Sequence, residues 1–339
     1  MSLVYRKRAN APSLSHWIYD YFGELKPFAR RIDRKLALLP LVFLKSVEWG
    51  IYRWYRTPIR RFYGVRGNEL IYMITKRCGE RCPKCGIWEI PEPNSQHLAL
   101  DHFIECLRRL HENLYQVTLT GGEPMIFRDD LLRIAEEARK LDVPMVTVTA
   151  GALLTESFLR RYGELRHVLV VSLDTVDPAK WEEFRGRDHY DRVMKNVALA
   201  HEILGDRLRV QSVLARESEV EVAGVGAFCR ERWIRHTIQP YMDFGGVWHG
   251  VEGLEVSDEP CAARKNICIY PNGDVVKCFD HRRIPIAREP LGNIGREDII
   301  EILCRRRATE VSRVMKTCNL PCKQLSCNKP AVLLESVPA

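Results

Sequence analysis

The sequence predicts an α/β fold: a partial (β/α)6 TIM-like barrel, a small cysteine-rich C-terminal domain and an N-terminal helical arm. Three observations support this prediction. Short β-rich segments alternate with amphipathic helical patterns from about residue 69, cysteines cluster both early and late in the chain, and the first 66 residues are strongly basic. The expected domains of the 339-residue chain are residues 1–66, 67–245 and 246–339.

Six β-rich segments are expected to form the barrel strands. They are residues 70–75, 116–120, 144–149, 168–173, 208–214 and 237–241. Between them, apolar residues recur at every third or fourth position, as in DHFIECLRRLHENL, RDDLLRIAEEARKL and YDRVMKNVALAHEIL, which is typical of amphipathic helices. In such barrels the chemistry collects where strands end and loops begin. The loops after these segments are therefore expected to form one site.

The N-terminal arm carries the positive charge of the chain. Residues 1–66 hold fourteen Lys and Arg and four Asp and Glu, a net charge of +10, whereas the whole chain has +8. The longest apolar run of the arm, residues 36–44, is too short to span a bilayer. Three interpretations remain open: basic helices packed on the barrel, contact with an anionic membrane surface, or binding of nucleic acid. Nucleic acid is disfavoured because no base-reading motif accompanies the charge.

The twelve cysteines favour metal or redox chemistry over disulfides. Disulfide scaffolds are short, and the N-terminal MSLVYRKRAN has no apolar segment typical of a secretory signal. A reducing cytoplasm is therefore expected, with contact at the inner face of the membrane as an option. In that compartment clustered cysteines indicate metal or redox sites.

The first cysteine cluster follows the first β-rich segment. In KRCGERCPKCGIW, residues 76–88, Cys78, Cys82 and Cys85 have the spacing C-x3-C-x2-C and no histidine nearby. A structural zinc site usually takes four ligands from two spaced pairs. In a [4Fe–4S] cluster, three thiolates would leave one iron open to bind another molecule. The cluster is the favoured interpretation, with zinc and inert cysteines as alternatives; the charged residues of the loop argue against an inert core.

Three further motifs follow the next β-rich segments. TGGEP (120–124) follows the second segment, TAG (149–151) the third and SLD (172–174) the fourth. A C-x3-C-x2-C motif after the first barrel strand, with GGEP after the second, resembles the radical S-adenosylmethionine (SAM) superfamily. The resemblance covers about residues 69–245.

The resemblance implies a cofactor and the residues that hold it. Cys78, Cys82 and Cys85 would bind three irons of a [4Fe–4S] cluster, and the methionyl amino and carboxylate groups of SAM would chelate the fourth. The glycines would let the backbone approach the methionine part of SAM closely, and the glutamate would accept a hydrogen bond from its ammonium group. Two residues at a strand end would contact the ribose. The implied SAM-binding residues are Gly121, Gly122, Glu123, Pro124, Ser172 and Asp174.

The resemblance also implies a reaction. The reduced cluster would donate one electron to the sulfonium of SAM, and a 5′-deoxyadenosyl radical would remove a hydrogen atom from the substrate. Two positions depart from the family pattern: Lys84 stands where an aromatic residue is common, and Ala150 where asparagine is frequent. Neither departure removes an iron ligand.

The second cysteine group resembles the SPASM or twitch extension of radical SAM enzymes, which carries auxiliary iron–sulfur clusters. Its segment CIYPNGDVVKC is expected to be a hairpin with a two-residue Asn-Gly turn. The resemblance rests on the spacing of its glycine and cysteines and implies metal ligands at Cys261, Cys268, Cys278, Cys318, Cys322 and Cys327. Counting thiolates favours one complete auxiliary cluster; a zinc knuckle is the alternative.

Cys268 has two open interpretations. With a strict two-residue turn it pairs with Lys277, so that Cys268 and Cys278 point to opposite faces and Cys268 is a core residue. A bulge would instead make it a ligand.

Four other residues are expected to be structural or exposed. Cys106 and Cys229 lie in amphipathic helical patterns. His249, in a glycine-rich loop, could approach the substrate, but a lone loop histidine is more often exposed. Arg185 lies in a context that also resembles the family, and a solvated arginine at a helix end explains it nearly as well. None of them is assigned a catalytic role.

Two hypotheses of function follow. The first is a radical SAM enzyme that uses an auxiliary cluster in a redox-type modification of a lipid or isoprenoid, a peptide or a sugar-like molecule, with a flavodoxin- or ferredoxin-like electron donor. The second is a non-enzymatic zinc module that contacts nucleic acid through the basic arm.

Overall fold

The computed structural model describes residues 68–92, 97–241, 245–250, 261–279 and 284–318, and all statements below concern these residues. Six parallel strands form one side of a nine-stranded sheet, in the order β6-β5-β4-β3-β2-β1 with β6 at the edge. Their bounds are β1 Asn68–Thr75, β2 Leu114–Gly121, β3 Met145–Thr149, β4 Val168–Ser172, β5 Leu208–Leu214 and β6 Arg235–Pro240. All six expected strands are therefore confirmed.

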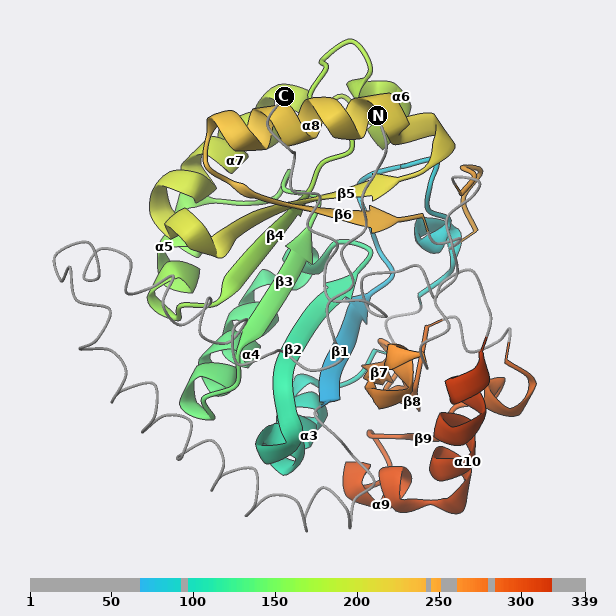
Figure 1. The fold of residues 1–339 in the computed structure, drawn as a ribbon. Helices are drawn as coiled ribbons and strands as arrows, with labels where there is room; N and C mark the ends of the chain where they lie inside the picture. The colour runs from blue at the N-terminus through green and yellow to red at the C-terminus, as the bar shows by residue number, and fades with distance from the viewer. Residues whose placement is uncertain (1–67, 93–96, 242–244, 251–260, 280–283, 319–339) are drawn as a thin grey trace, which may run out of the picture. The chain divides into compact units, whose positions relative to one another are not determined.

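Helices follow the strands in sequence and cover the outer side of the curved sheet (Figure 1). They are α3 Leu100–Leu110, α4 Arg128–Lys140, α5 Glu156–Glu164, α6 Trp181–Arg185, α7 Tyr190–Leu204 and α8 Glu219–Glu231. The core lies between the two layers; the rings of Tyr72 on β1 and Phe103 on α3, for example, stack 4.2 Å apart. This open parallel sheet with helices outside confirms the expected α/β partial barrel.

The C-terminal strands continue the same sheet beyond β1. Strand β7 (Ile267–Ile269) pairs in parallel with β1, and the short strands β8 (Asp274–Val276) and β9 (Gly292–Asn293) follow in antiparallel order. Helices α9 (Ile299–Cys304) and α10 (Arg306–Val314) complete this part. Residues of the predicted second and third domains therefore share one sheet. The predicted arm, residues 1–66, lies outside the described residues.

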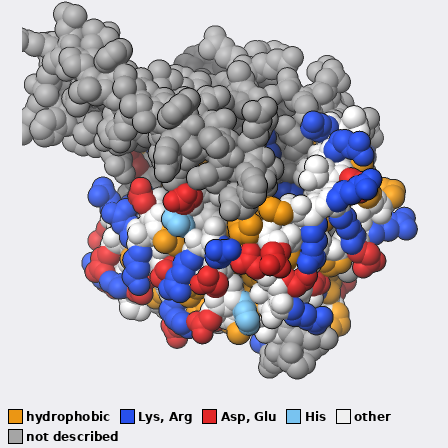
Figure 2. All heavy atoms as spheres, turned by 90° about the horizontal axis from the view of Figure 1, so that it is seen from below, with side chains coloured by type: hydrophobic (Ala, Val, Ile, Leu, Met, Phe, Trp, Pro, Cys, Tyr) orange, Lys and Arg blue, Asp and Glu red, His pale blue; other side chains and the backbone are white. Residues whose placement is uncertain are grey.

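Charges of both signs are mixed on the described surface. Figure 2 shows Lys and Arg side chains interspersed with Asp and Glu on the face that it presents. Residues 67–339 hold 38 basic and 40 acidic residues, which agrees with this mixture. Among the helices of the described segments, none has the length and apolar character needed to cross a membrane.

Candidate active site

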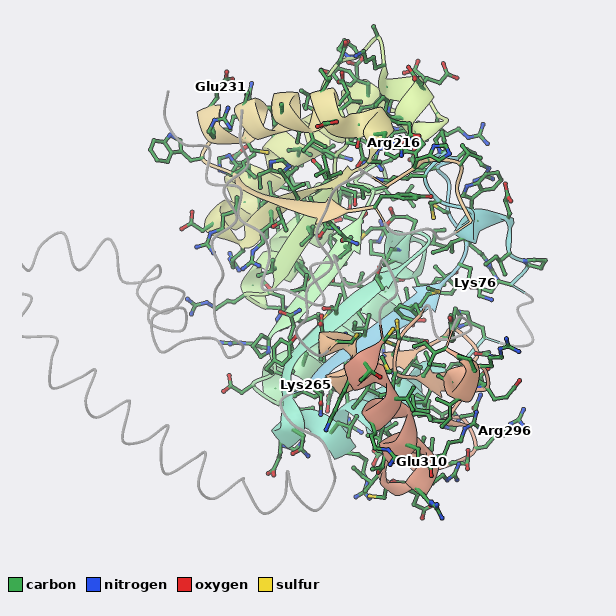
Figure 3. The ribbon with its side chains drawn as sticks, turned by 45° about the vertical axis from the view of Figure 1, so that its right-hand side comes forward. Lys76, Arg216, Glu231, Lys265, Arg296 and Glu310 are labelled. Atoms are coloured by element: carbon green, nitrogen blue, oxygen red, sulfur yellow. The ribbon has the colours of Figure 1, made fainter. Side chains whose placement is uncertain are left out.

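The three cysteines of the first motif lie on one loop at the carboxyl end of β1. This cysteine loop, residues 76–86, begins at Lys76 (Figure 3). Cys82 is buried, whereas Cys78 and Cys85 are partly exposed, and none of the ten cysteines in the described segments forms a disulfide. The structure thus places all three thiols at the edge of the sheet where the strand ends meet, as the motif predicted.

Main-chain hydrogen bonds hold the cysteine loop from three sides. After β2, the amide N–H of Glu123 donates to the carbonyl of Arg77 over 2.8 Å. After β4, the N–H of Arg81 donates to the carbonyl of Arg185, the last residue of α6, over 2.9 Å. After β6, the N–H of Val247 donates to the carbonyl of Pro83 over 2.7 Å. Three loops distant in sequence therefore fix the backbone that carries the cysteines.

Glycines make these close backbone contacts possible. A Cβ added to Gly122 would overlap the carbonyl oxygens of Lys76 and Arg77, and one added to Gly246 would overlap the backbone at Lys84. Gly186 adopts a φ of +62° against the backbone of Arg81. The sequence suggested that the glycines of GGEP let the backbone approach SAM; in the structure Gly122 also lets it approach the cysteine loop.

Glu123 joins the ends of β2 and β3. Its buried carboxylate accepts hydrogen bonds from the main-chain N–H groups of Met125 (2.9 Å) and Ala150 (2.7 Å) and from the hydroxyl of Thr149 (2.7 Å). Burial raises the pKa of Glu123 above its usual value, although these hydrogen bonds oppose the rise. The sequence suggested an acceptor for the SAM ammonium, and the structure shows that three donors of the chain already occupy this carboxylate.

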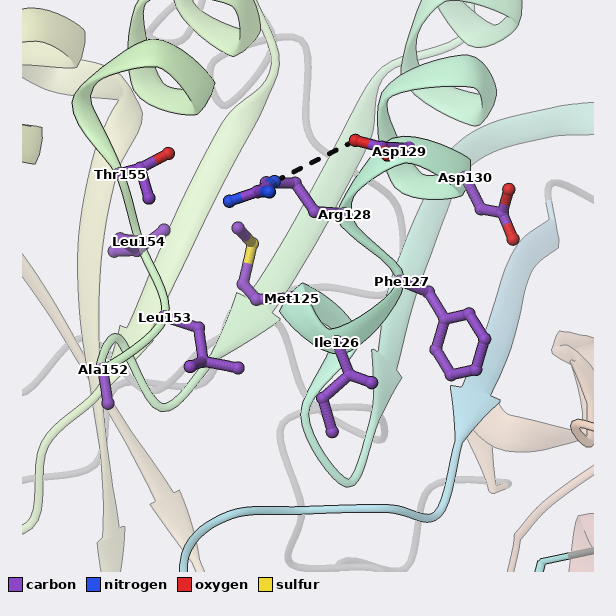
Figure 4. Close-up of a pocket in the computed structure, with 10 residues that line it drawn as sticks. All are labelled: Met125, Ile126, Phe127, Arg128, Asp129, Asp130, Ala152, Leu153, Leu154 and Thr155. Carbon is purple, nitrogen blue, oxygen red and sulfur yellow. Dashed lines mark ion pairs between the residues drawn. The ribbon is translucent and has the colours of Figure 1, made fainter.

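A pocket lies between the two segments that Glu123 joins. It has a volume of about 650 Å3 and is lined by the 3-10 helix η5 (Pro124–Phe127), the start of α4 and the loop after β3. Figure 4 shows Met125 between its two walls, with Ile126 and Leu153 on opposite sides. Ile126 and Leu153 are each 41% exposed, so the pocket offers apolar surface beside the GGEP motif.

Asp174 forms a buried ion pair with Lys84 of the cysteine loop. Asp174 is fully buried; it accepts from the Lys84 ammonium and, over 3.0 Å, from the N–H of Val213. Burial alone would raise the pKa of Asp174, but the charges of Lys84 and Arg185 outweigh it, so the pKa is lowered and the carboxyl is ionised at neutral pH. The family resemblance placed Asp174 at the SAM ribose, but in this structure its carboxylate lies among basic side chains.

Arg185 corrects an expectation from the sequence. It was explained as a solvated arginine at a helix end, but it is only 3% exposed. Its guanidinium lies 3.8 Å from the Cys82 sulfur and 3.8 Å from the Asp174 carboxylate, and it donates to the carbonyl of Ser172. The position of Arg185 at the end of α6 suggested that its side chain is exposed. The sequence of this five-residue helix does not reveal which residues pack against its end.

Two acidic residues that the sequence did not single out also hold the loop. The carboxylate of Glu92 accepts from the Thr75 hydroxyl over 2.6 Å and from the N–H of Lys76, where the loop begins. Glu80, inside the loop, is buried and pairs with His189 over 3.0 Å. Glu92 follows the cysteines closely in sequence, but only the return of the chain to the end of β1 gives it this contact.

Cys106, Cys229 and His249 lie as the sequence predicted. Cys106 on α3 and Cys229 on α8 are buried, and burial raises the pKa of the Cys229 thiol to about 12. His249 is exposed, and its imidazole contacts the carboxylate of Glu217 over 2.7 Å. These three residues need no catalytic role.

The C-terminal hairpin differs from the strict two-residue turn. Cys268 pairs with Val276 and Ile269 with Val275, which leaves a three-residue loop that ends at Gly273 with a φ of +87°. A three-residue loop of this kind is a common alternative to the two-residue turn when glycine takes the left-handed position. Of the two interpretations left open for Cys268, the register contradicts the one with a strict two-residue turn and a pairing with Lys277.

The observed register changes the residue that lies opposite Cys268. Cys268 pairs with Val276, the last residue of β8, and the chain bends at Lys277 before it reaches Cys278. Cys261 and Cys268 are buried, and Cys278 and Cys318 are partly exposed. Cys322 and Cys327 lie outside the described residues. The register thus removes the strict two-residue turn on which the interpretation of Cys268 as a core residue depended.

Replacing Cys268 with alanine tests its role. If Cys268 is a ligand, the variant should lose about four irons per chain on reconstitution while the cluster of the cysteine loop is retained. Cys229→Ala, an equally buried cysteine on a barrel helix, is the control and should keep its iron. If Cys268→Ala has unchanged iron content and an unchanged spectrum, Cys268 is a core residue and not a ligand.

The residues of the cysteine loop fit an iron–sulfur cluster. Three sulfur donors with no imidazole partner suit iron, and the guanidinium of Arg185 donates toward the sulfur of Cys82. Burial raises the pKa of the Cys78 thiol to about 12, so cluster binding would displace its proton. No group of three metal-binding side chains suited to one ion is found in the described part of the chain, and the cysteines of a cubane bind different irons.

Comparison with known families agrees with this donor set. A model of the radical SAM superfamily matches residues 72–218. A model of the SPASM iron–sulfur cluster-binding domain matches residues 261–328. The chain belongs to the radical SAM superfamily. Its radical SAM and SPASM domains imply a [4Fe–4S] cluster, SAM and auxiliary iron–sulfur clusters as cofactors. These two matches favour the radical SAM hypothesis over that of a non-enzymatic zinc module.

Curated relatives of this radical SAM protein include GTP 3′,8-cyclases. That of Rhodopirellula baltica is 32% identical over 183 residues, which are 50% of this chain and 49% of the relative. That of Aliarcobacter butzleri is 26% identical and aligns over 62% of this chain and 65% of the relative. The chain spans about half the length of the curated relatives it matches. The name of these relatives points to none of the substrate classes suggested by the sequence.

Solved radical SAM structures share the fold. Streptococcus suis SuiB bound to S-adenosylmethionine superposes with a TM-score of 0.64 at 15% sequence identity, covering 93% of this chain and 83% of that chain. At this identity the likeness establishes the fold alone.

Proposed function

We propose that this radical SAM enzyme cleaves SAM reductively at the cysteine loop and uses the cleavage to remove a hydrogen atom from a substrate held by the barrel. The observation that carries the proposal is the fixed cysteine loop, which the loops after β2, β4 and β6 hold at the strand ends. When bound, the [4Fe–4S] cluster and SAM supply a one-electron reduction and a hydrogen-abstracting group.

In this proposal the residues of the chain bind and orient the cluster and SAM. Cys78, Cys82 and Cys85 would hold three irons, and the segment after β2 would line the methionine part of SAM. Glu123 fixes this segment to the end of β3 through its three hydrogen bonds. Ser172, partly exposed at the end of β4, would contact the ribose.

The side chains on the inner face of the sheet favour binding of a polar substrate. On β5, Val210 is buried against the outer helices, so Gln211 points to the inner face, where its amide donates to the amide oxygen of Gln239 on β6 over 2.8 Å. Val146 and Val148 on β3 lie on the same face and are partly exposed. This face offers hydrogen bonds beside a small apolar area, which suits a polar molecule better than an isoprenoid chain.

The auxiliary cluster favours a redox-type outcome. The parallel pairing of β7 with β1 places the cysteine-bearing hairpin beside the strand that leads to the cysteine loop. We propose that the auxiliary cluster accepts an electron from the substrate or binds it. Because curated relatives are named GTP 3′,8-cyclases, GTP belongs in a substrate panel with peptides and sugar-like molecules.

Two partners are also proposed. A flavodoxin- or ferredoxin-like protein would supply the electron. Contact of residues 1–66 with an anionic membrane rests on their net charge of +10 and their aromatic residues.

Anaerobic reconstitution tests the function. The protein should bind about eight irons per chain, as two cubane clusters require, and should release 5′-deoxyadenosine from SAM when dithionite is added. The substrate should then be the member of the panel that raises this release and is itself altered. A colourless zinc protein, or a cluster whose spectrum does not respond to SAM, would contradict the proposal.

A further inference from the structure

We propose that Arg185 is a positioning residue for the [4Fe–4S] cluster, and that it and Asp174 set the reduction potential of that cluster through opposite charges. The inference rests on the cluster of the proposed function but not on SAM cleavage or on any substrate.

Arg185 contacts the cysteine loop with both its side chain and its main chain. The guanidinium donates toward the Cys82 sulfur over 3.8 Å, and the carbonyl accepts from the N–H of Arg81 over 2.9 Å. The next residue, Gly186, has a φ of +62°, and a Cβ there would overlap Arg81. The end of α6 is thus shaped to lie directly on the segment that carries Cys82.

The guanidinium is itself fixed from the other side. It donates to the carbonyl of Ser172 at the end of β4, and its carbon lies 5.5 Å from the ring centre of Trp181. An arginine bound at several points loses little freedom when it donates to a further acceptor. Arg185 can therefore hold Cys82 in one position relative to β4.

Buried charges of both signs lie around Cys82. Arg185 and Lys84 are cationic, and the carboxylate of Asp174 lies 3.8 Å from the former and pairs directly with the latter. All three side chains are nearly inaccessible, with exposures of 4%, 12% and 0%, so water screens them weakly. A second carboxylate, Glu80, pairs with His189.

A charge beside a cluster changes its potential in a predictable direction. Reduction adds negative charge, which a nearby cation or a hydrogen bond to sulfur stabilises and a nearby anion destabilises. Removal of the Arg185 charge should therefore make the potential more negative. Removal of the Asp174 charge should make it more positive.

The test compares Arg185→Gln, Arg185→Lys and Asp174→Asn in full-length reconstituted protein without SAM. Iron and sulfide content report cluster positioning, and redox titration followed by electron paramagnetic resonance reports the potential. We expect Arg185→Gln to bind less iron and to shift to a more negative potential, with partial recovery in Arg185→Lys. Asp174→Asn should shift in the opposite direction. The control is Arg187→Gln, an exposed arginine two residues further on, which should match the wild type.

Shifts of the reduction potential in opposite directions in Arg185→Gln and Asp174→Asn would indicate an electrostatic role, because a general loss of structure would not give opposite signs. Unchanged iron content and potential in Arg185→Gln, or shifts of the same sign in both variants, would overturn the inference. If Arg185→Gln does not fold, Asp174→Asn decides: a positive shift supports the inference and no shift overturns it. A wild-type cluster that forms but does not cleave SAM would contradict the proposed function and leave this inference standing.

Discussion

Replacing Cys82 with alanine is expected to abolish reductive cleavage of SAM. A cubane has four irons, and two remaining cysteines would leave two irons of the cluster without protein ligands. Cys82 is also the buried member of the motif and the one that contacts Arg185, so water or an exogenous thiol has poor access to replace it. The measurement is release of 5′-deoxyadenosine under dithionite, which should fall to the level without enzyme.

The iron content of the same variant distinguishes the two cluster sites. Cys82→Ala should lose about four irons per chain and keep those of the SPASM domain. Cys304→Ala is the matched control, because this cysteine is exposed at the end of α9, and it should retain both iron and activity. Full activity in Cys82→Ala would show that another residue holds the iron.

Replacing Gly122 with alanine is expected to displace the cysteine loop. The added methyl group would overlap the carbonyl oxygens of Lys76 and Arg77, and both are backbone atoms that cannot turn away as a side chain can. Overpacking of this kind costs about 1–3 kcal/mol of folding free energy, and here the strain falls on the segment that leads to Cys78. The midpoint of thermal unfolding and the iron content should both fall, as calorimetry and iron analysis can measure.

Gly79→Ala is the control for this prediction. Gly79 lies inside the cysteine loop, but a Cβ there meets no atom within 4 Å and its φ is not in the left-handed region. The variant should therefore keep its stability and its cluster. Equal effects of the two substitutions would mean that glycine in this region matters for reasons other than the contact of the β2 loop with Arg77.

The sequence predicted most of the barrel because its signals are local. All six strands and the helices α3, α4 and α7 follow from apolar periodicity within single segments. The sequence left the hairpin register open because Asn272 and Gly273 are compatible with both a two-residue and a three-residue loop. The register decides which residue lies opposite Cys268, so a shift of one residue changes the interpretation of a candidate ligand.

By itself the sequence determined the α/β class, the order of the motifs along the chain and the sulfur donors after β1, because each depends on residues that are close in sequence. Only the tertiary structure decided what surrounds those donors. Arg185, Asp174 and Gly246 reach the cysteine loop from segments about 90 to 160 positions away. Burial and charge pairing depend on which loops meet in space, and the parallel order of the strands creates that meeting.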